Sequence, residues 1–432
     1  MPVVRRHAED AAVLWTQLEA PEHADHLPAR QALDFGEYLL GHLQGLQIAG
    51  PPGFELSLEA LRRWRKPGEV FAALRTALSL HDGHERDEAC AEVFQVVREL
   101  PALLLRGAIS ALAWEPCDNA PAWCSHAQAS QDPVLRVAAL RASARRGLPV
   151  PNWADHLRHA RAEVRAAGCR CAPLQALPAL ETLFDDPDLP VRAEATLAWA
   201  RLVPHDERSA EDATLAASRL WRCVSALQAH LAQATGWHRS QVHRRLSRWL
   251  RHLAWLVPLG HTGVPQLLQQ MPMRLALNFV LHHGDADQLP FVLQALHHPE
   301  QARWAGWVWQ CLTGVDLQAA SLILPDPELD LDAPLSQIQH DADRGLPLPG
   351  PSALAAHPAS QLRLPQGQWL LMGHPGSAPR LRALLDPDAN QAQALRAVAA
   401  HALAQLHPGY ALNLRASPTS QTAALCRMGL QA

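Results

Sequence analysis

The residues best suited to chemistry by type and spacing are the basic side chains within residues 238–252. Arg244, Arg248 and Arg251 are spaced by four and three residues, so a helix places them in one stripe with Arg245 beside them. Such a stripe can bind phosphate groups or an acidic protein surface. A solvated outer helix face in an arginine-rich chain has the same pattern, and both interpretations stay open at this point.

Histidine and cysteine are the other candidates for reactive or metal-binding residues. The pairs His282–His283 and His297–His298 and the stretch 81–85 can hold Zn²⁺ only if two further ligands converge on them. The 8 cysteines form no C-x-x-C pair, and Cys169 and Cys171 stand where a packed helix needs small residues. Phosphate-binding loops and nucleophile motifs are also lacking. We therefore predict no catalytic residue, no metal and no cofactor.

Composition and charge limit the class of partner and the location. The formal net charge is −4, so no overall field attracts nucleic acid or an anionic membrane, and we expect a protein partner. No stretch approaches the roughly 20 apolar residues of a membrane span. Glu9 and Asp10 occupy the place of a signal peptide's apolar core. We expect a soluble, cytoplasmic protein with reduced cysteines, in an oligomeric state that the sequence leaves open.

The fold class follows from a repeat in an alanine- and leucine-rich chain. Arg136, Arg165 and Arg192 are 29 and 27 residues apart, and the third and sixth residues after each arginine are small. Small residues three apart share one helix face and let a neighbouring helix approach closely. Asp132-Pro133 and Asp186-Pro187 precede two of these helices, which matches the preference for Asp at or before an N-cap and for Pro near the first turn. Each period holds two short helices and a turn, which predicts an all-α solenoid of stacked helix pairs.

The repeat arginines are expected to serve the stacking and not a ligand. Each stands in the first turn of its helix, close in sequence to aspartate or glutamate, and such partly buried pairs fix the register between units. The predicted structural ladder comprises Asp132, Arg136, Arg165, Asp186, Arg192, Arg274 and Arg303.

We predict four segments along the chain: an N-terminal helical cap unit (1–85), the repeat array (86–313), a Pro-rich irregular segment (314–378), and a C-terminal repeat helix with a tail (379–432). The middle of the array, 209–257, should hold two longer helices, the first opened by a capping box at Ser209. Prolines are too dense in the irregular segment for helical repeats, although Trp369 suggests local packing. The last repeat helix is expected over 389–406.

An Asp-Pro start, a Val-Arg pair and small residues on this period resemble the short HEAT repeats called phycobilisome-lyase-like, over about residues 130–202 and 260–312. Further stretches resemble landmarks of a proteobacterial HEAT-repeat family of unclear function that is often encoded near type VI secretion loci. These landmarks stand at residues 3–15, 305–317, 345–349 and 367–373.

The solenoid favours binding over catalysis, because stacked repeats expose a long surface that holds segments of other proteins. We predict a non-enzymatic protein-binding scaffold or adaptor, and the resemblance implies an accessory role in type VI secretion, with a secretion component or effector as partner. The alternative is a HEAT-repeat enzyme or nucleic-acid-binding protein, lyase-like or glycosylase-like. The arginine stripe at 244–251 is the expected partner-binding site.

Overall fold

The computed structural model describes residues 2–203, 208–326, 343–362, 368–407 and 412–429. Regular structure in these residues is almost entirely helical. The two strands, β1 (Leu370–Leu371) and β2 (His374–Pro375), form one short antiparallel hairpin. The prediction of an all-α fold is confirmed. In the described part of the chain no helix is both long and apolar enough to cross a membrane.

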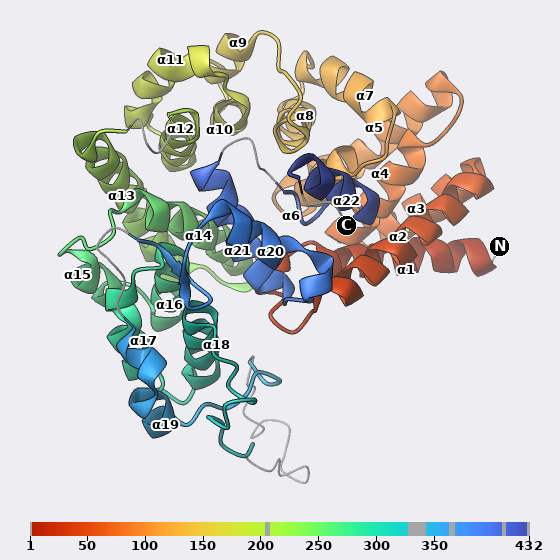
Figure 1. Cartoon of the computed structure of the whole chain (residues 1–432). Coiled ribbons are helices and arrows are strands. Elements are labelled where there is room, and N and C mark those ends of the chain that lie inside the picture. The colour runs from red at the N-terminus through yellow and green to blue at the C-terminus, as the bar shows by residue number, and fades with distance from the viewer. Residues whose placement is uncertain (1, 204–207, 327–342, 363–367, 408–411, 430–432) are drawn as a thin grey trace. The chain divides into compact units, whose positions relative to one another are not determined.

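The chain divides into two compact units (Figure 1). Unit 1 consists of residues 1–205 and 385–432, and unit 2 of residues 206–384. This division differs from the predicted segments, whose boundaries fall near residues 85, 313 and 378. The difference arises because the C-terminal part of the chain packs with the first helices, a long-range contact that a repeat pattern does not encode.

Unit 1 is built of helices in chain order, followed by two helices from the C-terminal segment. Its α-helices are α1 (Pro2–Leu18), α2 (Ala29–Ala49), α3 (Pro51–Trp64), α4 (Pro67–Leu78), α5 (Gly83–Glu99), α6 (Pro101–Ala113), α7 (Asn119–Gln128), α8 (Pro133–Arg146), α9 (Trp153–Leu157), α10 (Ala162–Cys171), α11 (Leu177–Thr182), α12 (Leu189–Leu202), α21 (Gln393–Leu406) and α22 (Pro418–Arg427). Its 3₁₀ turns are η1 (Pro21–His23), η2 (Leu174–Ala176), η3 (Leu183–Asp185) and η7 (Pro387–Ala389).

Six of these helices contact one another in succession and form what we call the inner row: α1, α4, α6, α8, α10 and α12. The shorter or peripheral helices α3, α5, α7, α9 and α11 pack beside them, and Figure 1 shows α9 and α11 on the far side of α10 and α12 from the C-terminal segment. Each helix of the inner row therefore packs against its predecessor and its successor. This order of contacts is what stacked helix pairs require.

Local sequence explains where the helices begin and end. Several helices of unit 1, among them α3, α4, α6, α8 and α22, start at a proline, whose missing N–H costs nothing in the first turn. The Asp132 carboxylate caps α8 by accepting from the Val134 N–H at 2.8 Å. Gly147, with φ of 66°, ends the same helix in the left-handed conformation. Asp132-Pro133 thus marks a helix start, whereas Asp186-Pro187 lies in the turn before α12, which Asp188 caps.

Glycines allow the closest approach within the inner row. A Cβ on Gly107 of α6 would lie 2.1 Å from the Pro67 carbonyl oxygen, and one on Gly68 of α4 would lie 2.5 Å from the Ala12 carbonyl oxygen. Any side chain at either position would force the backbones apart. Around this contact the buried side chains of α1, α4, α5 and α6, including Trp15 and Phe71, form the main hydrophobic core.

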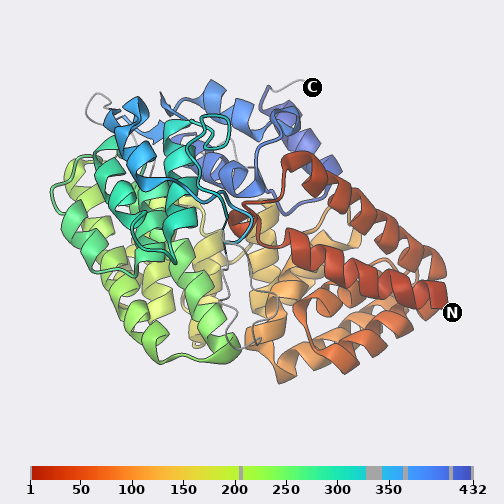
Figure 2. The same cartoon turned by 90° about the horizontal axis from the view of Figure 1, so that it is seen from below.

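The C-terminal segment returns to the start of unit 1, and Figure 2 shows it beside the first helices. The Ala29 N–H donates to the Gln391 carbonyl oxygen and the Gln393 N–H to the Leu27 carbonyl oxygen, both at 2.9 Å. Pro418 of α22 packs on α2 at Gly36, where a Cβ would lie 2.6 Å from its ring. The helix predicted over 389–406 begins only at residue 393, because η7 and a turn precede it.

Unit 2 contains α13 (Ala210–Gln233), α14 (Gly236–Leu256), α15 (Val264–Gln269), α16 (Met273–His283), η5 (Ala286–Gln288), α17 (Leu289–Ala295), α18 (Ala302–Thr313), α19 (Pro351–Ala356), η6 (Pro358–Gln361), the hairpin, and α20 (Ala378–Leu385), which ends at the division. The predicted cap at Ser209 is confirmed, since its hydroxyl accepts from the Asp212 N–H at 3.0 Å. Helices α13, α14, α16 and α18 contact one another in that order.

The β-hairpin closes the ends of α16 and α18. The Leu370 N–H donates to the Gly284 carbonyl oxygen and the Met372 N–H to the Cys311 carbonyl oxygen, each at 2.7 Å. The buried Trp369 ring donates its N–H to the His282 carbonyl oxygen at 3.0 Å. Local packing around Trp369 is therefore confirmed. Much of the remaining Pro-rich segment, residues 327–342 and 363–367, lies outside the described residues.

Candidate functional site

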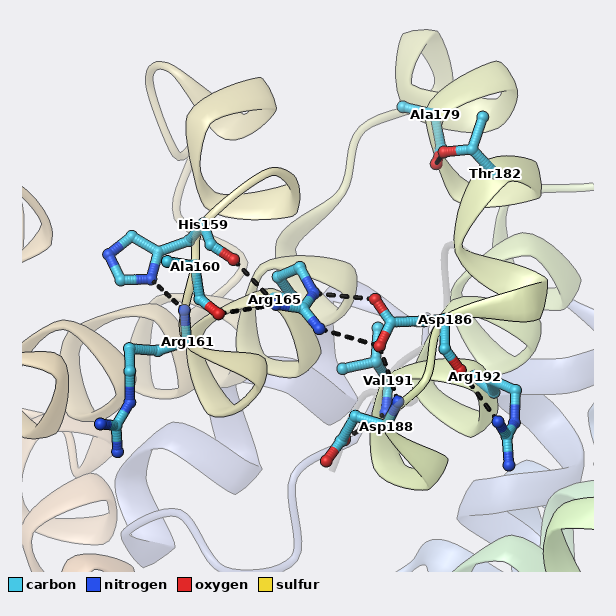
Figure 3. A network of polar contacts seen from close by, with 10 residues as sticks. All are labelled: His159, Ala160, Arg161, Arg165, Ala179, Thr182, Asp186, Asp188, Val191 and Arg192. Carbon is cyan, nitrogen blue, oxygen red and sulfur yellow. Dashed lines mark hydrogen bonds and ion pairs between the residues drawn. The ribbon is translucent and has the colours of Figure 1, made fainter.

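The predicted structural ladder is most complete between α10 and the turn that precedes α12 (Figure 3). Arg165 of α10 donates from Nε and Nη2 to the two carboxylate oxygens of Asp186, both at 2.8 Å. Its Nη1 also donates to the carbonyl oxygens of His159 and Ala160. The guanidinium is only 14% exposed and the carboxylate 6%. Arg165 thus joins the start of its own helix to the next helix pair.

Arg192, the next repeat arginine, uses a backbone acceptor. Its Nη1 donates to the Asp186 carbonyl oxygen at 2.9 Å, while the Asp186 carboxylate also accepts from the Asp188 N–H. Asp188 in turn caps α12 by accepting from the Val191 N–H at 3.1 Å. Burial disfavours the charged Asp186, but these hydrogen bonds and Arg165 outweigh it and lower its pKa.

The other ladder residues take different partners from those that their sequence neighbours suggest. Arg136 donates to the Ser130 carbonyl oxygen at 2.9 Å and does not pair with Asp132. Asp132 instead accepts from Nε of Arg98 of α5. Arg136 and Arg165 occupy the same position of the repeat. Arg165 forms an ion pair with the next unit, whereas Arg136 binds a backbone carbonyl of the loop before its own helix.

In unit 2 the repeat arginines hold the Pro-rich segment. Arg274 pairs with Asp343 and stacks over the Trp304 ring, with its guanidinium carbon 4.2 Å from the ring centroid. Arg303 donates to the Asp326 carboxylate at 2.7 Å and to the Leu346 carbonyl oxygen. Both arginines therefore form ion pairs with the Pro-rich segment, and Arg274 also contacts the neighbouring helix α18 through Trp304.

The basic stripe lies on α14, but its members differ in exposure. Arg245 is exposed, whereas Arg244, Arg248 and Arg251 are half-buried. Next to them, burial and the charges of nearby arginines lower the pKa of His243, so this face of α14 is partly desolvated. The arrangement is less open than a solvated stripe, and its binding role remains a prediction.

Neither the histidine pairs nor the cysteines gather into a metal site within the described ranges. His283 is buried and directs Nδ1 to the Ala254 carbonyl oxygen at 2.9 Å, and burial lowers its pKa. Cys171 donates to the Leu140 carbonyl oxygen at 2.8 Å, and burial raises its pKa to about 12. A thiol held protonated in this way is a packing group and not a nucleophile.

A second set of arginines, in the last turns of inner-row helices, escaped the sequence analysis. Arg146 of α8 donates to the Leu112 carbonyl oxygen near the end of α6. Arg201 of α12 donates to the carbonyl oxygens of Arg170 and Ala172 at the end of α10. Arginines here satisfy carbonyls that a helix end leaves unpaired. Their signal in the sequence is a basic residue nine or ten positions after the repeat arginine, at 136 + 10 = 146 and 192 + 9 = 201.

Beside these caps lies a charged cluster of unit 1, which we call the Arg145 cluster. Three of its carboxylates each have an arginine: Glu19 accepts from Arg106 at 2.7 Å, Glu22 from Arg415 at 2.7 and 2.8 Å, and Glu194 from Arg170 at 2.8 and 3.0 Å. The fourth arginine, Arg145 in the last turn of α8, is different. Among the residues that the structure describes, its guanidinium forms no hydrogen bond and no ion pair.

Unit 2 also contains an apolar pocket of about 180 Å³ between α13, α14 and the start of α15. Trp221, Leu253 and Val264 line it, and His261 is its ionisable residue, with Nδ1 accepting from the Gly263 N–H at 3.0 Å. A pocket of this size accepts a side chain more readily than a cofactor.

Comparison with known proteins adds no assignment: no family model, no curated protein and no solved structure matches this chain.

Proposed function

We propose that the protein is a non-enzymatic scaffold or adaptor that binds a partner protein through unit 1. In this proposal the stacked helices act as a HEAT-like solenoid, whose long faces hold other proteins. The polar network of Figure 3 supports a structural use of the repeat signature, because its charged groups join one helix pair to the next.

The observation that carries the proposal is the set of apolar side chains that α1 and α2 expose. These two helices pack against each other, and Ile48 is 87% exposed, Val3 68%, Tyr38 62% and Val13 58%. Single exposed apolar residues are common on any protein, and we take these four, which all lie on one helix pair, as the candidate protein-binding surface. An aromatic residue such as Tyr38 is also typical of interface cores.

We further propose that the partner is a component or effector of type VI secretion and that binding takes place in the cytoplasm. The support for this setting is the resemblance of the landmarks at 3–15, 305–317, 345–349 and 367–373 to the proteobacterial family.

The test is affinity capture with the tagged full-length chain from the cytoplasm of its native host. We expect one defined protein in constant ratio, and its loss in the variants Ile48→Glu and Tyr38→Glu. Leu174→Glu is the matched control, because Leu174 is 58% exposed but lies on η2. Recovery of nucleic acid alone, released steeply by salt, would support the nucleic-acid alternative and contradict the proposal. Full retention of the partner by both variants would also contradict it.

A further inference from the structure

Helix α13 of unit 2 has one buried face and one open face. The buried face contains Leu220, Val224 and Leu227, and α13 packs against α14. A second stripe of α13 consists of side chains that are all exposed: Glu211, Leu215, Ser218 and Arg222. These positions are four, three and four residues apart, so they share one face of the helix. This face is open to another molecule.

The open face of α13 borders two hollows that form one groove. The apolar pocket of about 180 Å³ between α13, α14 and the start of α15 is lined on its α13 side by Thr214, Ser218 and Trp221. A second hollow is lined by Glu211 and Leu215, and it shares Thr214 and Ser218 with the pocket. The two hollows therefore form one groove along α13, about 15 Å long at 1.5 Å per residue. We call it the α13 groove.

The α13 groove offers apolar contacts at two places. At one end the pocket is walled by the buried Leu253 and Val264 and by the half-buried Trp221. Leu215, which lies six positions before Trp221, is 43% exposed and lines the second hollow. Six helical residues span about 9 Å, and apolar side chains one to two turns apart on an amphipathic helix match this separation.

Two opposite charges stand at the ends of the open face. Glu211 lies in the first turn of α13, and Arg222 directly follows Trp221. Both side chains are exposed, and among the residues that the structure describes neither forms an ion pair or a hydrogen bond. A ligand with a basic group at the Glu211 end and an acidic group at the Arg222 end gains at both ends. A uniformly acidic or basic ligand meets a like charge at one end.

This charge order argues against the chain's own Pro-rich segment as the occupant. Residues 327–342 contain four leucine or isoleucine residues, but also four carboxylates and neither lysine nor arginine. Such a segment has no basic group for Glu211. An occupant that carries both charges has to come from another protein.

We propose that the α13 groove is a docking site for an amphipathic helix of a partner protein. An apolar side chain of that helix occupies the pocket beside Trp221, a basic residue faces Glu211, and an acidic residue faces Arg222. This is the helix-in-groove mode of recognition, in which apolar anchors give affinity and flanking charges fix the direction of the helix.

The inference goes beyond the proposed function and does not rest on it, because the groove belongs to unit 2 and the apolar surface of α1 and α2 belongs to unit 1. Ile48→Glu should abolish partner capture by unit 1 and leave binding to the groove unchanged. Each idea can therefore fail while the other stands.

The experiment measures binding of three labelled synthetic helices of about 18 residues, long enough to follow the whole groove. All three carry the same leucine stripe. The dipolar probe has lysine at one end and glutamate at the other, the acidic probe has glutamate at both ends, and the basic probe has lysine at both ends. Fluorescence anisotropy with the full-length chain at about 50 mM salt reports their affinities, since higher salt screens exposed charges.

We expect the dipolar probe to bind about tenfold more tightly than the acidic or the basic probe, because each of these exchanges one attractive contact for a repulsive one. Lack of binding by all three probes would overturn the docking site. Equal affinities of the three would overturn the role of Glu211 and Arg222.

Ser218→Phe tests the groove itself, because the larger side chain fills the space that both hollows share. We expect the affinity for the dipolar probe to fall at least tenfold while the melting temperature stays unchanged, since Ser218 is exposed. Ser240→Phe is the matched control, because Ser240 is an exposed residue of α14 that lines neither hollow. Equal affinities of the two variants would contradict the assignment.

Glu211→Arg tests the charge order by reversing one end. The variant should bind the dipolar probe more weakly than the wild type and the acidic probe more tightly, because both of its ends are now basic. An unchanged ranking of the probes would contradict the proposed orientation.

Other occupants of the groove give different results. A photo-cross-linking residue in place of Leu215 should react with the dipolar probe. Cross-links to residues 327–342 of the same chain would instead identify the chain's own segment. A dimer in sedimentation that Ser218→Phe dissociates would identify a second copy. Either result would overturn the partner helix.

Discussion

Arg165 and Asp186 join two successive helix pairs of unit 1 through two parallel hydrogen bonds of 2.8 Å. Both oxygens of the Asp186 carboxylate accept a hydrogen bond at once, and the side chains of Arg165 and Asp186 are largely shielded from water. Because the arginine belongs to α10 and the aspartate to the turn before α12, we expect the pair to fix how far one helix pair is shifted along the next. The first prediction concerns this pair.

Arg165→Ala should lower the free energy of unfolding by about 3 kcal/mol, because it leaves the Asp186 carboxylate buried without its partner. Urea denaturation monitored by circular dichroism measures the change. Arg161→Ala is the control, since Arg161 pairs with Glu163 at the surface and its loss should change stability little. Similar effects of both substitutions would show that the Arg165 pair does not hold the register.

Acid should lower the stability of unit 1 by protonating the Asp186 carboxylate. The pKa of Asp186 is lowered in the folded protein, so the unfolded chain binds a proton more readily. The stabilising contribution is fully present above the ordinary aspartate pKa of about 3.9 and is lost as the pH falls through the lower folded value. Unfolding curves between pH 5 and pH 3 should show this loss, and Asp186→Asn should flatten it. An equally steep curve in the variant would contradict this role.

Protonation of His156 should lower the stability of unit 1 at a higher pH than protonation of Asp186 does. Burial, and next the charge of Arg136, lower its pKa, and its buried Nδ1 has no hydrogen-bond partner. Below the unfolded histidine pKa of about 6.5 the unfolded chain binds more protons, so stability falls as the pH decreases from 7.5 to 5.5. His156→Gln should make this dependence shallower in urea titrations. A steeper dependence would mean that the folded protein favours the charged ring.

Two glycines should respond in opposite directions to the same substitution. Gly107→Ala places a methyl group 2.1 Å from the Pro67 carbonyl oxygen and should destabilise by about 3 kcal/mol or more. Gly41 lies on an exposed part of α2, where an added Cβ would have no atom within 4 Å. Gly41→Ala should therefore raise the free energy of unfolding by about 0.5–1 kcal/mol. Thermal unfolding of the two variants distinguishes the close approach of α4 and α6 from a general preference for alanine in helices.

Local sequence patterns predicted the elements that depend on neighbouring residues. Asp132 and Pro133 mark the start of α8, and Ser209 caps α13, because capping uses atoms two or three residues away. Trp369 was correctly expected to pack locally. The all-α class follows from the same short-range patterns.

Long-range partners could not be predicted in this way. The contacts of Arg274 and Arg303 with the Pro-rich segment depend on where that segment crosses the helices, and a repeat alignment contains no information about this. The charges near Arg145 are even less visible, because Glu19, Arg170 and Arg415 come from distant parts of the chain. Identical arginines in one sequence pattern thus acquire different roles through distant neighbours.

The return of the C-terminal segment has a consequence for biosynthesis. Residues 206–384 interrupt unit 1 in the chain, so the ribosome completes α1 and α2 long before α21 and α22 emerge. During that interval the surface of α2 around Gly36, later covered by Pro418, is open to chaperones and to other nascent chains. Unit 1 can therefore reach its final form only after residues 385–429 have been synthesised, and a chain truncated before them leaves the surface of α2 around Gly36 uncovered.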